Sequence, residues 1–161
     1  MSAVRFRLWA HTDMAKDSVK LVEEIAKKSP NLVVLVCPDF IRRKRAIDLY
    51  LKHFTSFELF KVGADFVPDV TLNLSLFGKT PIYLVSQIET LTNDIQKKFV
   101  EASKSAMILA VGEKLAARTP LRTLAEKLES YIEIPALRGI EVYGWATREF
   151  KRLGKNITKP A

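Results

Sequence analysis

Short apolar runs recur along the chain and are separated by longer amphipathic stretches. Each run is rich in β-branched, leucine or aromatic side chains, and the run at 57–62 is the weakest of the set: residues 32–37, 57–62, 82–86, 106–111 and 131–134. Most of the runs lack a strict alternation of apolar and polar residues, which is typical of parallel strands covered on both faces. The pattern predicts five strands, and an alternating segment at 4–8 predicts an additional edge strand.

The intervals between the runs carry apolar residues at helical spacing. They predict helices at residues 13–28, 39–54, 93–102, 119–128 and 142–153. Thr119 followed by Pro120 is a typical helix start, and Gly154 is a typical residue after a helix end. We expect Phe40 to lie on the apolar face of the second helix and Phe150 on that of the last.

The alternation of strands and helices predicts an α/β fold, with helices on both faces of a mostly parallel sheet. A chain of 161 residues, 48% of them hydrophobic, is typical of one globular domain, so we expect residues 1–161 to form a single domain. The apolar runs are too short to cross a membrane, and the N-terminal residues lack the apolar stretch of a signal peptide. Cys37 is the single cysteine, and the sequence therefore favours a reducing, cytoplasmic location.

The chain is basic, with 26 Lys and Arg against 18 Asp and Glu and a net charge of +8. Such an excess favours work close to nucleic acid or to an acidic partner. The densest basic run lies in the second predicted helix, where successive residues turn by about 100°, so its charges fan around the axis. A solvated helix face is the simplest interpretation, and contact with a phosphate backbone is the alternative. The candidate nucleic-acid contacts are Arg42, Arg43, Lys44, Arg45, Lys97 and Lys98.

One segment resembles the end of a phosphate-binding loop, namely Gly78-Lys79-Thr80. The full motif needs a glycine five residues before Gly78, where this chain has Asn73, and it must open a helix. Here Pro81 and a predicted strand follow instead, so we expect a turn that enters a strand.

Asp39 follows the first predicted strand, where α/β folds place ligand and metal residues. A helix N-cap is the simpler interpretation, because no second acid or base is visible nearby. The common metal, nucleophile and dinucleotide motifs do not occur in the sequence. We therefore expect no catalytic residues, no metal and no cofactor.

Leucines alternate with small polar residues at 71–76, and the pair Leu76-Phe77 then meets Gly78 just before a predicted strand. A Leu-Phe pair at such a turn usually belongs to the core. If the pair is exposed, it forms a hydrophobic projection suited to binding another protein.

The segment Ser75-Leu76-Phe77-Gly78 and the strand after it resemble the N-terminal domain of the delta subunit of the bacterial DNA polymerase III clamp loader. The other segments resemble that domain in the same order: residues 32–39 its first strand and turn, 57–65 its second strand, 106–115 a strand before a lysine-rich turn, and 134–157 its final strand, helix and exit.

The resemblance implies a RecA-like AAA+ domain of three layers with a mostly parallel five-stranded sheet and no phosphate-binding loop. It implies a role in DNA replication, as a part of the DNA polymerase III holoenzyme with no ATPase activity of its own. The delta subunit binds the ring-shaped beta sliding clamp and helps to open it. The residues that match the family's clamp-binding plug are Leu76 and Phe77, with Ser75 beside them.

Two departures from the family bear on this prediction. The turn Cys37-Pro38-Asp39 stands where the family usually has glycine before acidic residues. The family also continues into a small helical domain and an oligomerising collar, which we expect to be absent, so other clamp-loader subunits are partners only if a collar is supplied.

Two alternative functions stay open. One is a nucleotide-dependent enzyme that uses Asp39 and the Gly78 turn, and the other is a basic module that binds nucleic acid. We expect DNA contact to be weak and indirect, and no membrane partner.

Overall fold

The computed structural model describes residues 14–65 and 78–156, and the predicted alternation of strands and helices is confirmed over this part of the chain. The strands are β1 (Leu32–Val36), β2 (Phe57–Val62), β3 (Thr80–Val85), β4 (Met107–Gly112) and β5 (Tyr131–Glu133). The helices are α1 (Met14–Lys28), α2 (Phe40–Leu51), the 3-10 turn η2 (Ile88–Thr90), α3 (Asn93–Ala102), α4 (Pro120–Lys127) and α5 (Ile140–Arg152). The edge strand predicted at 4–8 lies outside the described residues.

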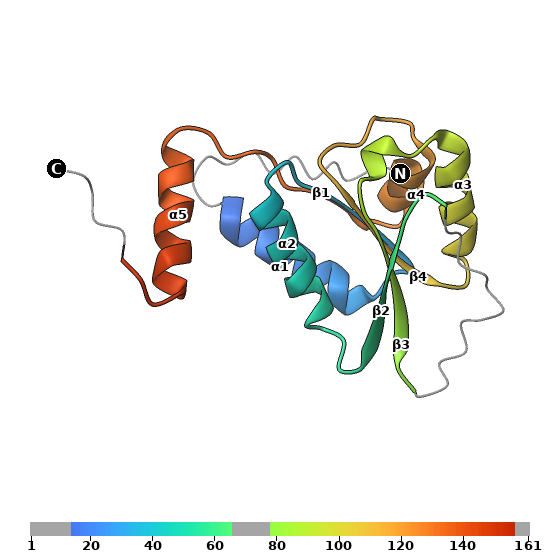
Figure 1. Cartoon of the computed structure of the whole chain (residues 1–161), viewed down its shortest axis with the longest axis horizontal. Helices are drawn as coiled ribbons and strands as arrows, with labels where there is room; N and C mark the ends of the chain where they lie inside the picture. The colour runs from blue at the N-terminus through green and yellow to red at the C-terminus, as the bar shows by residue number, and fades with distance from the viewer. Residues whose placement is uncertain (1–13, 66–77, 157–161) are drawn as a thin grey trace.

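The five strands form one sheet in the order β2-β3-β4-β1-β5, and every pairing in it is parallel. The first strand of the chain is therefore an inner strand. It pairs with β4 in the register Leu32↔Ile108 and with β5 in the register Val34↔Tyr131. Figure 1 shows the twisted sheet with β2 and β3 side by side.

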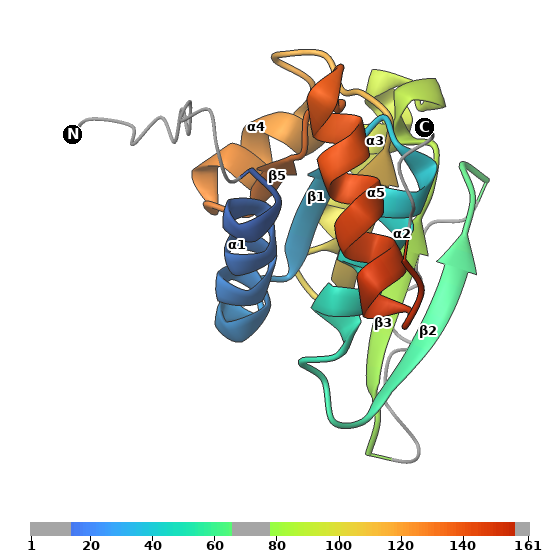
Figure 2. The same ribbon diagram turned by 90° about the vertical axis from the view of Figure 1, so that its left-hand side faces the viewer.

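Helices cover both faces of the sheet, which gives three layers (Figure 2). On one face Val33 and Leu35 of β1 pack with buried side chains of α1 and α2. On the other face Leu32 and Val34 pack with buried side chains of α3 and α4. Successive residues of β1 thus point into two different apolar layers, and this is why its sequence is a continuous apolar run.

Gly112, the last residue of β4, allows a close approach between that strand and η2. A Cβ atom at this position would lie 2.7 Å from Cγ1 of the buried Ile88 and would collide with the Glu89 carboxylate. The Glu89 carboxylate also accepts a hydrogen bond from the backbone N–H of Glu113, at 3.2 Å. The absence of a side chain at Gly112 therefore lets η2 lie directly against the end of β4.

Two expectations about apolar faces are wrong. Phe40 is 69% exposed, because it lies in the first turn of α2, before the helix reaches the sheet. Phe150 is 43% exposed, and no residue of α5 is fully buried. The reason is the position of α5: it lies away from the sheet, with α1 and α2 nearer to it than any strand (Figure 1), so a single narrow side of the helix is covered.

Candidate interaction site at the strand ends and helix α5

The residues predicted to bind the clamp, Ser75, Leu76 and Phe77, lie outside the described residues. The described chain resumes at Gly78, which is exposed and has φ +70°, a left-handed conformation that suits glycine. Thr80 is the first residue of β3, so the Gly-Lys-Thr turn enters a strand, as predicted. This turn therefore lacks the helix N-terminus that holds phosphate in a nucleotide-binding loop.

The turn after β1 occupies the place where open α/β sheets usually bind ligands, because the strand order reverses beside this strand. Here groups at the start of α2 form hydrogen bonds with Cys37, the residue that follows the last residue of β1. The Arg43 guanidinium donates a hydrogen bond of 2.6 Å to the Cys37 carbonyl oxygen, and the Cys37 thiol donates one of 3.5 Å to the carbonyl oxygen of Asp39. Burial raises the pKa of the Cys37 thiol. The turn is thus occupied by its own side chains.

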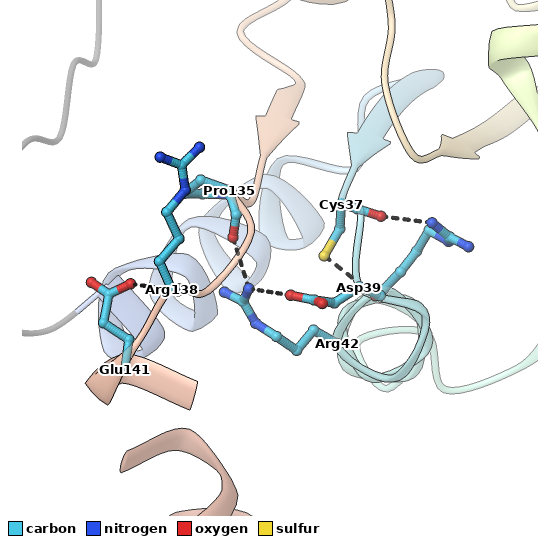
Figure 3. Close-up of polar contacts among 7 residues, drawn as sticks. Cys37, Asp39, Arg42, Pro135, Arg138 and Glu141 are labelled. Atoms are coloured by element: carbon cyan, nitrogen blue, oxygen red, sulfur yellow. Dashed lines mark hydrogen bonds and ion pairs between the residues drawn. The ribbon is translucent and has the colours of Figure 1, made fainter. Parts of the chain in front are cut away.

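Arg42 joins this turn to the segment before α5 (Figure 3). Its Nη1 lies 2.9 Å from the Asp39 carboxylate and 2.7 Å from the carbonyl oxygen of Pro135, and the residue is 7% exposed. Asp39 occupies the N-cap position of α2, as predicted, but its carboxylate makes no capping hydrogen bond and pairs with Arg42 instead. We call these three residues the Arg42 clasp. The expectation of a solvated basic face is therefore wrong for Arg42.

The start of α5 lies next to the clasp. The Glu141 carboxylate accepts a hydrogen bond of 3.2 Å from the backbone N–H of Arg138. Gly139 between them has φ +54° and is the N-cap residue of α5. Figure 3 shows this turn beside Pro135 and Arg42, so the clasp and the turn together position the first turn of α5 near the end of β1.

The other members of the basic run have separate surroundings. The Arg43 guanidinium lies 5.9 Å from the centre of the Phe40 ring. Arg45 forms an ion pair with Glu149 of α5, and burial, with a smaller contribution from the nearby Arg152, lowers the pKa of Arg45. Lys44 is exposed. The run therefore serves partly to hold α2 against its neighbours.

Lys97 and Lys98, the other candidate nucleic-acid contacts, lie on α3. Both are exposed, and Lys97 Nζ is 3.5 Å from the Asp94 carboxylate. Because α2 and α3 cover opposite faces of the sheet, the structure does not bring these lysines together with the basic run of α2. Contact of either group with nucleic acid stays a prediction.

A groove of about 350 Å³ lies between α1, α2 and α5, and sequence reasoning missed it. In Figure 2, α5 lies in front of α2 with α1 beside them. The residues that line it are Ser18, Val19, Lys20, Val22, Arg42, Arg45, Ala46, Leu49, Ile134, Trp145, Arg148, Glu149 and Arg152. The basic spacing of Arg148 and Arg152 is visible in the sequence, but nothing there shows which helices α5 meets.

The described residues contain neither a cluster of metal ligands nor a helix that could span a membrane. In residues 14–65 and 78–156, no three His, Cys, Asp or Glu side chains gather in a way that would hold a metal ion. None of the helices in these two ranges combines the length and the apolar character needed to span a bilayer.

Known proteins offer a structural likeness but no sequence match. No family model and no curated protein sequence matches the chain. The solved structures include the DNA clamp loader delta protein YqeN of Bacillus subtilis, which superposes with a TM-score of 0.57 at 14% sequence identity and covers 87% of this chain and 49% of its own. PCH-2 of C. elegans is more distant, with a TM-score of 0.44 at 11% identity, covering 92% of this chain and 49% of its own. The chain thus spans about half the length of each.

Sheet order and structural likeness together define the fold class. The all-parallel sheet of five strands, covered by helices on both faces, is an α/β fold, and its architecture is similar to that of the B. subtilis clamp loader delta protein. The fold that the sequence predicts is confirmed. At 14% identity the likeness describes the fold, and the function is taken up below as a proposal.

Proposed function

We propose that the chain is a non-catalytic, delta-type clamp-loader module that binds the beta sliding clamp of DNA polymerase III and helps to open it. The observation that carries the proposal is the segment Ser75-Leu76-Phe77-Gly78, which directly precedes β3 in a fold like that of a clamp loader delta protein. The fold supplies the scaffold, and the Leu-Phe pair supplies the binding group.

The chemistry of the proposed contact is hydrophobic. Burial of Leu76 and Phe77 in an apolar pocket of the clamp contributes about 1.5–3 kcal/mol for each side chain, before the costs of association. The described flank of the pair suits a surface role, because Gly78 and Lys79 are both exposed. A ring held together by protein interfaces opens when a ligand binds the open form better than the closed one. The plug would act by this differential binding, without a chemical step.

A titration with purified beta sliding clamp tests the proposal. We expect the chain to bind the clamp in solution with saturable heat, and the binding to persist when salt is raised, because the contact is apolar rather than ionic. A sliding clamp whose pocket is already filled by an excess of a clamp-binding peptide is the control and should show no heat. Absence of binding to the free clamp would contradict the proposed function.

A separate part of the proposal is that the chain does not bind a nucleotide. The turn after β1 contains no glycine, and the Arg43 guanidinium is bound to the Cys37 carbonyl oxygen where a phosphate would need backbone N–H groups. We expect isothermal titration with ATP and Mg²⁺ to show no heat of binding. A micromolar dissociation constant would instead favour the alternative of a nucleotide-dependent enzyme.

A further inference from the structure

We propose that the groove between α1, α2 and α5 binds an acidic segment of a partner protein, which inserts apolar side chains between the helices. The proposal does not rest on the clamp-binding role, because none of the groove residues belongs to the Ser-Leu-Phe-Gly segment. Its volume of about 350 Å³ is at the lower end of the range of small-ligand sites and suits a few side chains.

The floor of the groove is apolar and comes from several elements. Val19 lies on α1 and Leu49 on α2, and both are partly buried. Trp145 contributes from α5, while Ile134 lies in the segment after β5. Since these side chains line an open groove, an apolar group placed there would exclude water from them and gain hydrophobic free energy.

The rim of the groove carries an excess of positive charge. Lys20 comes from α1, Arg45 from α2, and Arg148 and Arg152 from α5. Glu149 is the acidic side chain among the described residues that line the groove, and it is shared by Arg45 and by Arg152, whose Nε is 3.2 Å away. Arg148 makes no ion pair with any residue that the structure describes. The groove therefore offers cations that its own acid does not neutralise.

The distribution of these cations points to a chain with several negative charges. They lie on three helices, and Arg148 and Arg152 are one turn apart, about 6 Å along α5. A small ligand with one anionic group would reach one part of this rim, whereas a peptide with carboxylates at intervals would reach several. Charge complementarity of this kind specifies partners and their register.

The chemistry of the floor favours such a peptide over a nucleic acid. Single-stranded nucleic acids bind by stacking bases on aromatic side chains along a basic groove. This floor contains Trp145 but is otherwise aliphatic, as at Val19 and Leu49. Polar base edges would lie against aliphatic carbon there, whereas leucine-like side chains of a peptide would fit.

The intrinsic fluorescence of Trp145 gives a direct measurement of binding. The chain has two tryptophans, so the variant Trp9→Phe leaves Trp145 as the reporter. The probe is a short synthetic peptide in which leucines alternate with glutamates and aspartates. We expect it to change the Trp145 emission saturably. A matched peptide with glutamine and asparagine in place of the acids should bind at least about tenfold more weakly, since each exposed ion pair contributes up to about 1 kcal/mol.

Two pairs of charge reversals locate the binding site. In the Trp9→Phe background, the double variant Lys20→Glu with Arg148→Glu should bind the acidic peptide with an affinity lower by roughly tenfold or more. Lys97→Glu with Lys98→Glu makes the same change in charge on the opposite face of the sheet and should leave the affinity unchanged. Circular dichroism of both variants checks the fold, and clamp binding by the Lys20/Arg148 variant should be unaltered.

Three results would overturn the inference. The first is equal binding of the acidic and amide peptides. The second is an equal loss of affinity in the two pairs of variants, which would mean that net charge rather than the groove attracts the peptide. The third is displacement of the peptide by a single-stranded oligothymidylate that loses affinity in the Lys20/Arg148 variant alone, which would assign the groove to nucleic acid.

Discussion

Replacement of Leu76 and Phe77 together by alanine is expected to lower the affinity for the sliding clamp by about 30- to 1000-fold. The change corresponds to roughly 2–4 kcal/mol, which is typical for the loss of two anchors at the centre of an interface. If the pair is a surface plug, the melting temperature should stay almost unchanged. The measurements are the heat of clamp binding and the thermal unfolding of the same variant.

A position of Leu76 and Phe77 in the core would give the opposite result. Truncation of two core side chains would cost the fold about 2–5 kcal/mol for each residue, so the variant would melt at a much lower temperature. Such a loss of stability would return Leu76 and Phe77 to the core and remove the basis of the clamp-binding proposal. Lys79→Ala, two residues beyond the pair and exposed, is the matched control and should change neither measurement appreciably.

Removal of the Arg42 side chain is expected to reduce the free energy of unfolding by about 2–4 kcal/mol. Arg42→Ala deletes a charge-assisted hydrogen bond to Asp39 and one to the Pro135 carbonyl, and such bonds contribute about 1.5–3 kcal/mol each. Asp39 is partly exposed, and water can replace some of this loss. Urea denaturation of the variant gives the change in free energy directly.

Lys44→Ala is the natural comparison, because Lys44 belongs to the same basic run but is exposed. It should change stability by no more than about 0.5 kcal/mol. Arg42→Lys keeps the charge but lacks the planar fork that reaches two acceptors, so it should restore part of the stability at most. Wild-type stability of Arg42→Ala, combined with weaker DNA binding, would contradict the clasp and favour the nucleic-acid contact predicted from the sequence.

The inner strands β1 and β4 were predictable because burial on both faces leaves a continuous apolar run in the sequence. β2 is an edge strand without a fully buried residue, and its run is the weakest, yet both of its bounds were predicted correctly. Helix α3 was likewise predicted residue for residue. The order of the strands follows from how the chain crosses the sheet, which no local pattern records. The resemblance to a clamp-loader domain implied a mostly parallel sheet of five strands, and the structure adds their order, β2-β3-β4-β1-β5.

The site residues that escaped prediction depend on contacts between distant parts of the chain. Asp39 is three residues from Arg42 and could be noticed, but Pro135 is 93 residues away. The apolar face of α5 was predicted from its spacing, yet spacing alone does not state whether a sheet or two helices will cover it. For the same reason the groove that includes Trp145 could not be predicted.

The inner position of β1 has a consequence for how the protein is made. Its partner β4 comes 76 residues later, as the register Leu32↔Ile108 shows. At a synthesis rate of about 5–20 residues per second, β1 waits roughly 4–15 s for this partner. During that time a continuous apolar strand is without its native neighbour, and segments of this composition associate readily with other chains. Nascent chains should therefore depend on chaperones that shield the segment around β1. Expression at low temperature should raise the soluble yield, because incomplete chains then accumulate and associate more slowly.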